Sequence, residues 1–144
     1  MSLSNVFNIA GSAMSAQTIR LNTTASNMAN AQSVSSSEGE TYRARKPVFE
    51  LQQAETLQPG SIPLGVQAGQ GVNVAGIVES DSPLRQEYSP DHPMADENGY
   101  VYYPNVNVVE EMADMISASR SFQINAEIMN TAKQMMQRAL TLGQ

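Results

Sequence analysis

The only histidine in the chain, His92, lies in the segment where a chemical role is easiest to imagine. Asp91 precedes it, and Asp96 and Glu97 follow closely. An imidazole beside carboxylates is a donor set that binds divalent metal ions. The same stretch is rich in Asp, Asn and Pro, which form turns, and the chain offers no second His and no Cys to complete a nucleophilic site. We therefore expect a turn here, with no catalytic residue, no metal and no cofactor. An enzyme that depends on His92 is the alternative.

The composition excludes several classes of protein. The chain has 144 residues, a net charge of −6 at pH 7 and no cysteine. Nucleic-acid binding needs a basic face, so we expect no nucleic-acid partner. No apolar run is long enough to cross a bilayer, and we expect no direct membrane insertion. The N-terminus lacks the basic and apolar regions of a cleavable secretory signal. Taken alone, this favours the cytoplasm.

Large apolar side chains recur every seven residues at both ends of the chain. Near the start they are Phe7, Met14, Leu21 and Met28, with Leu3, Ala10, Gln17, Thr24 and Ala31 between them. Near the end they are Val108, Met115, Phe122, Met129 and Met136, with Met112, Ser119, Ala126, Lys133 and Leu140 between them. This spacing is typical of helices that wind around a partner along a narrow seam. We predict two such helices, which pack against each other or against copies of the chain.

The second helix has recognisable ends. Asn107 followed by Glu110 fits a capping box, in which Asn accepts from a backbone N–H and Glu reaches back. Neither Gly nor Pro interrupts residues 105–142, and Gly143 is placed to end the helix. At about 1.5 Å per residue the helix is a rod of roughly 50 Å. A rod of this length predicts an elongated subunit, because it exceeds the size of a compact chain of this length.

The first helix is almost free of charge. Residues 1–37 contain one charged residue, Arg20, whereas an ordinary surface helix has a charged face. Small neutral side chains all round predict a helix enclosed by protein, even at Ser12 and Ser26, which lie off the seam. Because only 41% of the chain is hydrophobic, one chain can scarcely bury both helices. We expect many copies to pack together.

The middle of the chain has a different composition. All seven Pro and all five Tyr fall between residues 39 and 104. Residues 32–41 are polar and resemble a mobile linker. Three segments are predicted as strands, namely 42–51, 71–79 and 100–103. The predicted fold is therefore mainly α: an elongated subunit with paired, coiled-coil-like terminal helices (residues 1–31 and 105–144) and a linker with a small β-rich insert (residues 32–104).

Two features leave binding alternatives open. The methionines of the last helix are flexible and polarizable, so they are also compatible with the peptide groove of a helical secretion chaperone. The seam interpretation is preferred because it explains the first helix too. The basic cluster of Arg43, Arg45 and Lys46 is either solvated or placed against an acidic patch on a neighbouring copy.

Two stretches resemble bacterial flagellar axial proteins. Residues 21–31 contain the Ser-Asn-x-x-Asn pattern of their N-terminal signature, and residues 104–112 are similar to the start of the C-terminal helix in the rod branch of that family. Segments 92–101, 117–122 and 140–144 are similar to the same branch. Many axial proteins continue the signature with Thr-Pro-Gly-Tyr, where this chain has a longer linker. The signature residues are Ser26, Asn27, Ala29, Asn30, Asn105, Asn107 and Glu110.

The resemblance implies a structural subunit of the flagellar basal-body rod and no enzyme. Such proteins leave the cell through the flagellum-specific export apparatus without a cleaved signal, so the expected location moves to the periplasmic rod. Its expected partners are copies of itself, other rod and basal-body proteins, and the export apparatus. Terminal helices would then form a hollow shaft that transmits torque from motor to hook.

Overall fold

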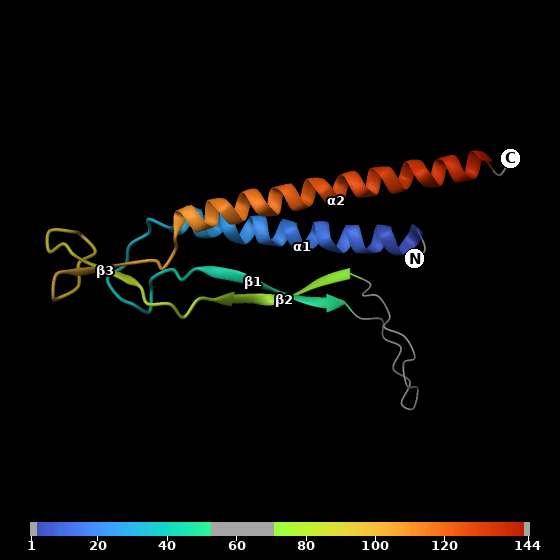
Figure 1. Ribbon diagram of the computed structural model, residues 1–144. Coiled ribbons are helices and arrows are strands. Elements are labelled where there is room, and N and C mark those ends of the chain that lie inside the picture. Colours follow the sequence, from blue (N-terminus) through green and yellow to red (C-terminus); the bar gives the residue numbers. More distant parts are fainter. Residues whose placement is uncertain (1–2, 53–70, 143–144) are drawn as a thin grey trace, which may run out of the picture.

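The computed structural model describes residues 3–52 and 71–142 and has an elongated shape (Figure 1). The start of the first helix and the end of the last one lie towards the same end of the molecule. In chain order the elements are α1 Leu3–Asn30, β1 Arg45–Gln52, β2 Gly71–Glu79, β3 Arg85–Tyr88, β4 Tyr100–Tyr103 and α2 Val108–Leu142.

The helix α1 is the central layer of the molecule. It packs against α2 on one side and against both strands of the β1–β2 hairpin on another (Figure 1). The two helices run antiparallel, and the β3–β4 hairpin lies beyond the point where α1 ends and α2 begins. The predicted outline of paired terminal helices with a small β insert is confirmed. The sequence predicted that other copies enclose α1. This prediction was incomplete, because the β1–β2 hairpin of the same chain covers part of the helix.

Both β units are antiparallel two-stranded hairpins. The β1–β2 register runs from Arg45↔Glu79 to Gln52↔Gly71, with a bulge at Val48/Phe49. The predicted strands 71–79 and 100–103 are confirmed, whereas the first strand begins at Arg45 rather than at residue 42. The strand β3 was not predicted. Its sequence, Arg-Gln-Glu-Tyr, shows no alternation of apolar and polar residues, and its pairing with β4 makes it a strand.

The core of the described residues is made of small side chains. Of the buried hydrophobic residues only Val101 is larger than alanine; the others are Ala10, Ala16, Ala31, Ala44, Ala118 and Ala132. Because alanine lets helix backbones approach closely, α1 and α2 lie near each other without filling the space between them with large residues. The larger seam residues Phe7, Met14, Leu21 and Met28 are half-buried.

The least exposed face of α2 runs along the predicted row of large side chains. The residues between them are shifted by one position from those predicted. The residues on this face alternate in steps of four and three: Glu111, Met115, Ala118, Phe122, Asn125, Met129 and Ala132. Met112 and Leu140 are 50% and 68% exposed, so they take no part in the buried face of this chain. Val108 and Met136, at 37% and 40%, are also exposed. A seam role for these four residues stays a prediction about contacts between copies.

The segment 32–41 follows a defined path, which corrects the expectation of a loose linker. Ser35 and Tyr102 exchange two backbone hydrogen bonds, of 3.1 and 3.0 Å, which tie the segment to β4. The Thr41 hydroxyl donates to the Ser37 carbonyl oxygen at 2.8 Å, and Ser35 and Thr41 are buried. The chain therefore passes from α1 to β1 through a packed turn.

The helix α2 is longer than its partner, with 35 residues against 28 in α1. Its C-terminal part extends past the start of α1 (Figure 1). Residues 133–141 are all exposed, and Met135 and Leu140 are exposed by 58% and 68%. We call residues 133–142 the overhang.

Candidate functional site

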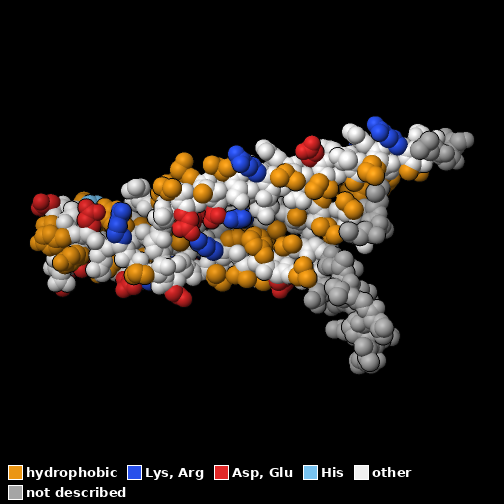
Figure 2. Space-filling model, viewed as in Figure 1, with side chains coloured by type: hydrophobic (Ala, Val, Ile, Leu, Met, Phe, Trp, Pro, Cys, Tyr) orange, Lys and Arg blue, Asp and Glu red, His pale blue; other side chains and the backbone are white. Residues whose placement is uncertain are grey.

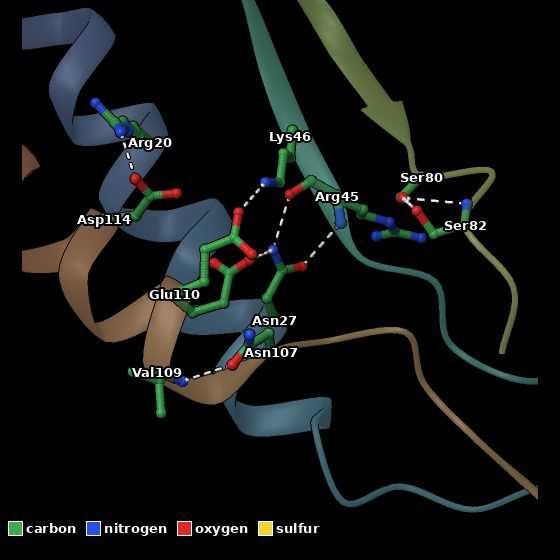
Figure 3. Close-up of polar contacts among 11 residues, drawn as sticks. Arg20, Asn27, Arg45, Lys46, Ser80, Ser82, Asn107, Val109, Glu110 and Asp114 are labelled. Atoms are coloured by element: carbon green, nitrogen blue, oxygen red, sulfur yellow. Dashed lines mark hydrogen bonds and ion pairs between the residues drawn. The ribbon is translucent and has the colours of Figure 1, made fainter. Parts of the chain in front are cut away.

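The side chain of Asn27 joins the three layers of the molecule. Its amide Nδ2 donates to the Arg45 carbonyl oxygen at 2.8 Å and to Glu111 Oε1 at 3.0 Å. Its Oδ1 accepts from the Arg45 backbone N–H at 2.9 Å and from the Tyr42 hydroxyl at 2.8 Å. An asparagine side chain offers two donor hydrogens and two acceptor lone pairs. All four are used, and Asn27 is only 1% exposed. Figure 3 shows its bonds to the backbone of Arg45.

The carboxylate that faces Asn27 is unusual because it is buried. Glu111 lies in the first turns of α2 and is 4% exposed. Burial raises the pKa of Glu111, while the hydrogen bond from Asn27 and the charge of Lys46 oppose that shift. Burial likewise raises the pKa of Tyr42. These polar groups are sequestered between layers, so they act as structural contacts rather than as groups open to a substrate.

Two ion pairs near Asn27 connect α1 and β1 to α2. Arg20 is the single charged residue of the first helix. Its Nη2 donates to Asp114 Oδ1 at 2.6 Å. Lys46 Nζ donates to Glu110 Oε1 at 2.9 Å and thereby links β1 to α2 (Figure 3). The Lys46–Glu110 pair is about half exposed, and pairs of this kind contribute little to stability. The two ion pairs therefore act between layers that the hydrogen bonds of Asn27 already hold together.

The start of α2 is organised by two asparagines. Asn107 caps the helix, because its Oδ1 accepts from the Val109 backbone N–H at 3.1 Å. The predicted capping box is only half present, since Glu110 points to Lys46 instead of returning to the cap. Asn105 accepts from the Ala44 backbone N–H at 2.7 Å and donates to the Ser80 and Ser82 carbonyl oxygens at 3.1 and 2.8 Å. It thereby ties the segment before α2 to the ends of β1 and β2.

The other signature residues make local contacts only. Ser26 and Ala29 are exposed and Asn30 is half-buried. The Ser26 hydroxyl donates to the Asn22 carbonyl oxygen, and Asn30 Nδ2 donates to the Ser26 carbonyl oxygen, both within α1. The signature therefore divides into residues that hold the layers together and residues that face outwards. We call the first set, with its partners, the joint: Asn27, Tyr42, Arg45, Lys46, Asn105, Asn107, Glu110 and Glu111.

The basic cluster is engaged within the chain. Arg43 pairs with Glu38 at 3.1 Å, Arg45 with Glu79 at 3.1 Å and Lys46 with Glu110 at 2.9 Å. Each cation therefore has an internal partner, and the suggested contact with an acidic patch on another copy loses its basis.

The His92 segment is a turn, as predicted. The imidazole Nδ1 accepts from the Met94 backbone N–H at 3.1 Å, and Asp96 Oδ1 accepts from the backbone N–H groups of Asn98 and Tyr100, both at 2.8 Å. Within residues 3–52 and 71–142 no three His, Cys, Asp or Glu side chains come together in a way that would hold a metal ion. Over the same residues neither helix is apolar enough to span a bilayer.

Sequence reasoning selected Asn27 only through the resemblance, and it missed Tyr42, Arg45 and Glu111 as its partners. The bonds to Arg45 and Glu111 cross 18 and 84 residues of sequence. The one local signal for Glu111 was its place beside Glu110 at the start of a helix, where an acidic residue is ordinarily solvated. Nothing in that pattern distinguishes a buried carboxylate from a solvated one.

Comparisons with known proteins agree with the resemblance. The family model described as "Flagella basal body rod protein" matches residues 7–34, and "Flagellar basal body rod FlgEFG protein C-terminal" matches residues 97–142. The chain is 51% identical over 144 residues to the flagellar basal-body rod protein FlgC of Salmonella typhimurium, and 50% identical to that of Escherichia coli O6:H1. Both alignments cover 100% of each chain.

A more distant relative, FlgC of Borreliella burgdorferi, is 38% identical over 151 aligned positions, which cover 100% of this chain and 99% of the relative. The aligned region therefore spans both helices and both hairpins. The chain belongs to the family of flagellar basal-body rod proteins, in its FlgC branch.

Proposed function

We propose that this rod subunit assembles through its two terminal helices with copies of itself and with other rod and basal-body proteins. In this proposal the helices form coiled-coil-like contacts within a hollow periplasmic shaft that transmits torque from motor to hook. The chain reaches the shaft through the flagellar export apparatus, without a cleaved signal. The observation that carries the proposal is the full-length identity of 51% to a flagellar basal-body rod protein.

The surface of the helices supports assembly. Exposed large hydrophobic side chains lie along α2, among them Val109 at 76%, Ile124 at 58% and Leu140 at 68%. Large contiguous apolar surfaces on a protein mark interaction sites. In a shaft built from many copies these side chains would be covered by neighbours, and each subunit would be held at several points.

The joint supports a mechanical role. A subunit that passes on torque must keep its helices and its β insert in one arrangement, because a loose connection would absorb rotation. Asn27 is buried and bonded at all four of its positions, and Asn105 adds three further bonds nearby. The comparisons give no support to the alternative of a secretion chaperone with a Met-rich groove.

Purified basal bodies test the proposal. The gene is deleted from its host and replaced by a tagged copy, and basal bodies are isolated and examined by mass spectrometry and electron microscopy. We expect the chain in the rod, with an uncleaved N-terminus, and an incomplete rod and no swimming in the deletion strain. A chain that is absent from intact basal bodies of the complemented strain would contradict the proposal.

A further inference from the structure

One face of α2 carries a row of branched and long side chains that stays exposed among the described residues. Met112, Ile116, Ile124 and Ile128 recur in steps of four or eight, are 42–58% exposed and, with Arg120 between them, form what we call the α2 ridge. Such i±4n rows are the ridges that pack into grooves of neighbouring helices. A shallow groove beside the row is lined by Ala113, Ile116, Ser117, Arg120, Ser121 and Ile124. Figure 2 shows apolar side chains at the surface along α2.

The complementary surface is the open side of α1. Its residues alternate in steps of four and three, as in a helix seam, but all are small and uncharged. We call this set the α1 open face: Ser4, Asn8, Gly11, Ser15, Thr18, Asn22, Ala25 and Ala29. All except Gly11 are exposed, and Gly11 is half-buried. A helix face that remained in water would ordinarily be charged.

Gly11 gives an independent reason to expect a close neighbour there. A glycine inside a helix is less favourable than alanine by about 0.5–1 kcal/mol. Within residues 3–52 and 71–142, no atom beyond the surrounding turns of α1 lies within 4 Å of the position that a Cβ on Gly11 would take. The packing of the described residues therefore does not require glycine at this position. By contrast, Gly71 has the Ser12 hydroxyl where its Cβ would be, so that glycine is explained inside the chain.

We infer that the α2 ridge of one copy packs on the α1 open face of a second copy, with a ridge side chain seated over Gly11. This rests on the proposed function and specifies the surfaces through which copies meet. Bulky side chains meet small ones, as helix packing requires, and the uncharged open face offers no repulsion to Arg120. The ridge spans 17 residues, roughly 25 Å at about 1.5 Å per residue. The open face spans 26 residues and is long enough to receive it.

The geometry of this contact makes it directional. The ridge and the open face are different surfaces of the same chain, so the contact is head-to-tail and leaves one of each free at the ends of an open assembly. Contacts of this kind form rings or open helical filaments rather than closed dimers. Stable complexes involve about 20–30 residues on each side, whereas the ridge has five. We therefore expect a monomer in dilute solution and attachment only where several contacts act together.

Replacing Gly11 by leucine separates assembly from folding. We expect Gly11→Leu to leave the purified chain folded, with an unfolding midpoint equal to or above that of the wild type, because the helix loses a glycine and the side chain meets open space. Incorporation into basal bodies should fall at least tenfold. Gly39→Leu is the matched control, since a Cβ there also meets nothing within 4 Å and Gly39 lies outside both surfaces. Normal incorporation of Gly11→Leu would overturn the inference.

Cross-linking identifies the two surfaces directly, and the absence of cysteine from the chain makes single cysteines unambiguous. Strains that express a mixture of Ser15→Cys and Ile116→Cys chains should give cross-linked dimers in isolated basal bodies with a short bismaleimide. Either variant alone should give none. Dimers of Ile116→Cys alone, or no dimers in basal bodies that contain both variants, would overturn the inference. If even wild-type chains are missing from basal bodies, the proposed function itself fails; if only the cross-link is missing, the function stands.

Discussion

The joint and the exposed faces of the helices differ in how their contacts are made. At the centre of the joint, polar side chains are buried and their hydrogen bonds are made within one chain, as at Asn27 and Glu111. Along the helices the contacts rely on alanines, and large side chains such as Ile116 and Ile124 remain exposed. The contacts of the joint are complete in the single chain, whereas in the proposed assembly neighbours complete those of the helix faces. Damage at the joint should therefore appear in the isolated protein, and damage on the open faces only in the assembly.

The largest effect on the isolated protein is expected from Asn27→Ala. The change removes four hydrogen bonds and leaves the Tyr42 hydroxyl, the Arg45 backbone and Glu111 with unmet partners. Buried polar groups left in this way destabilise a protein by about 3–5 kcal/mol in total. Urea unfolding followed by circular dichroism measures the loss. Asn30→Ala, which removes only a contact within α1, is the control, and an equal loss in both variants would mean that the joint has no special role.

The next effect concerns the packing between the helices. Ala118 is fully buried, so Ala118→Leu should destabilise the chain by about 1–3 kcal/mol through overpacking. Ala113 is exposed on the same helix, and Ala113→Leu should change stability by less than about 0.5 kcal/mol. Thermal unfolding of the two variants compares them. The reverse order would show that another face of α2 meets α1.

The pH dependence of stability tests the buried carboxylate. Burial raises the pKa of Glu111 above 4.5 in the folded chain, so the folded state holds this proton more tightly than the unfolded state. The stability linked to this proton is complete below pH 4.5 and is lost as pH rises through the folded-state pKa.

Glu111→Gln should abolish this dependence while leaving the rest of the pH profile unchanged. The difference in unfolding free energy between wild type and variant, measured in urea from pH 4 to pH 8, isolates the contribution of this one group. Glu87→Gln on the exposed strand β3 serves as the control. A flat difference for Glu111→Gln would show that its carboxylate is solvated.

The smallest effect is expected for the exposed ion pair of the joint. Lys46 and Glu110 are 52% and 57% exposed, and such pairs contribute about 0–1 kcal/mol. Lys46→Gln should therefore lower the unfolding free energy by no more than about 0.5 kcal/mol. A double-mutant cycle with Glu110→Gln measures the pair alone. A coupling several times larger would mean that the joint depends on charge rather than on the Asn27 amide.

The sequence predicted the positions of the helices better than it predicted which face of each helix is buried. Seven-residue spacing and the cap at Asn107 predicted both helices, but spacing does not determine which neighbouring column turns inward. Met112 looked like a seam residue because it is apolar, yet the buried residue at the start of α2 is Glu111, held by Asn27. The partner from another element decides the face, and one sequence does not contain that information.

The same limit applies to the first helix. Ser12 and Ser26 were expected to be enclosed by neighbours. The Ser12 hydroxyl accepts from the Val72 backbone N–H at 3.1 Å, so the chain's own hairpin covers it, whereas Ser26 is exposed. Low charge on a helix predicts that something covers it, but not what. Within the joint, Asn27 and Asn105 were selected only by resemblance, because their bonds connect residues that are distant in the sequence.

The unequal lengths of the helices have a consequence for how the subunit yields under load. Where α2, α1 and the β1–β2 hairpin lie side by side, the cross-section is three layers deep, whereas the overhang is a single helix (Figure 1). Resistance to bending rises steeply with the depth of a beam. A force applied across the subunit would therefore bend the overhang first and leave the layered part straight. Each subunit thus combines a stiff beam with a compliant tip, and the stiffness of a shaft built from it depends on how firmly neighbours support those tips.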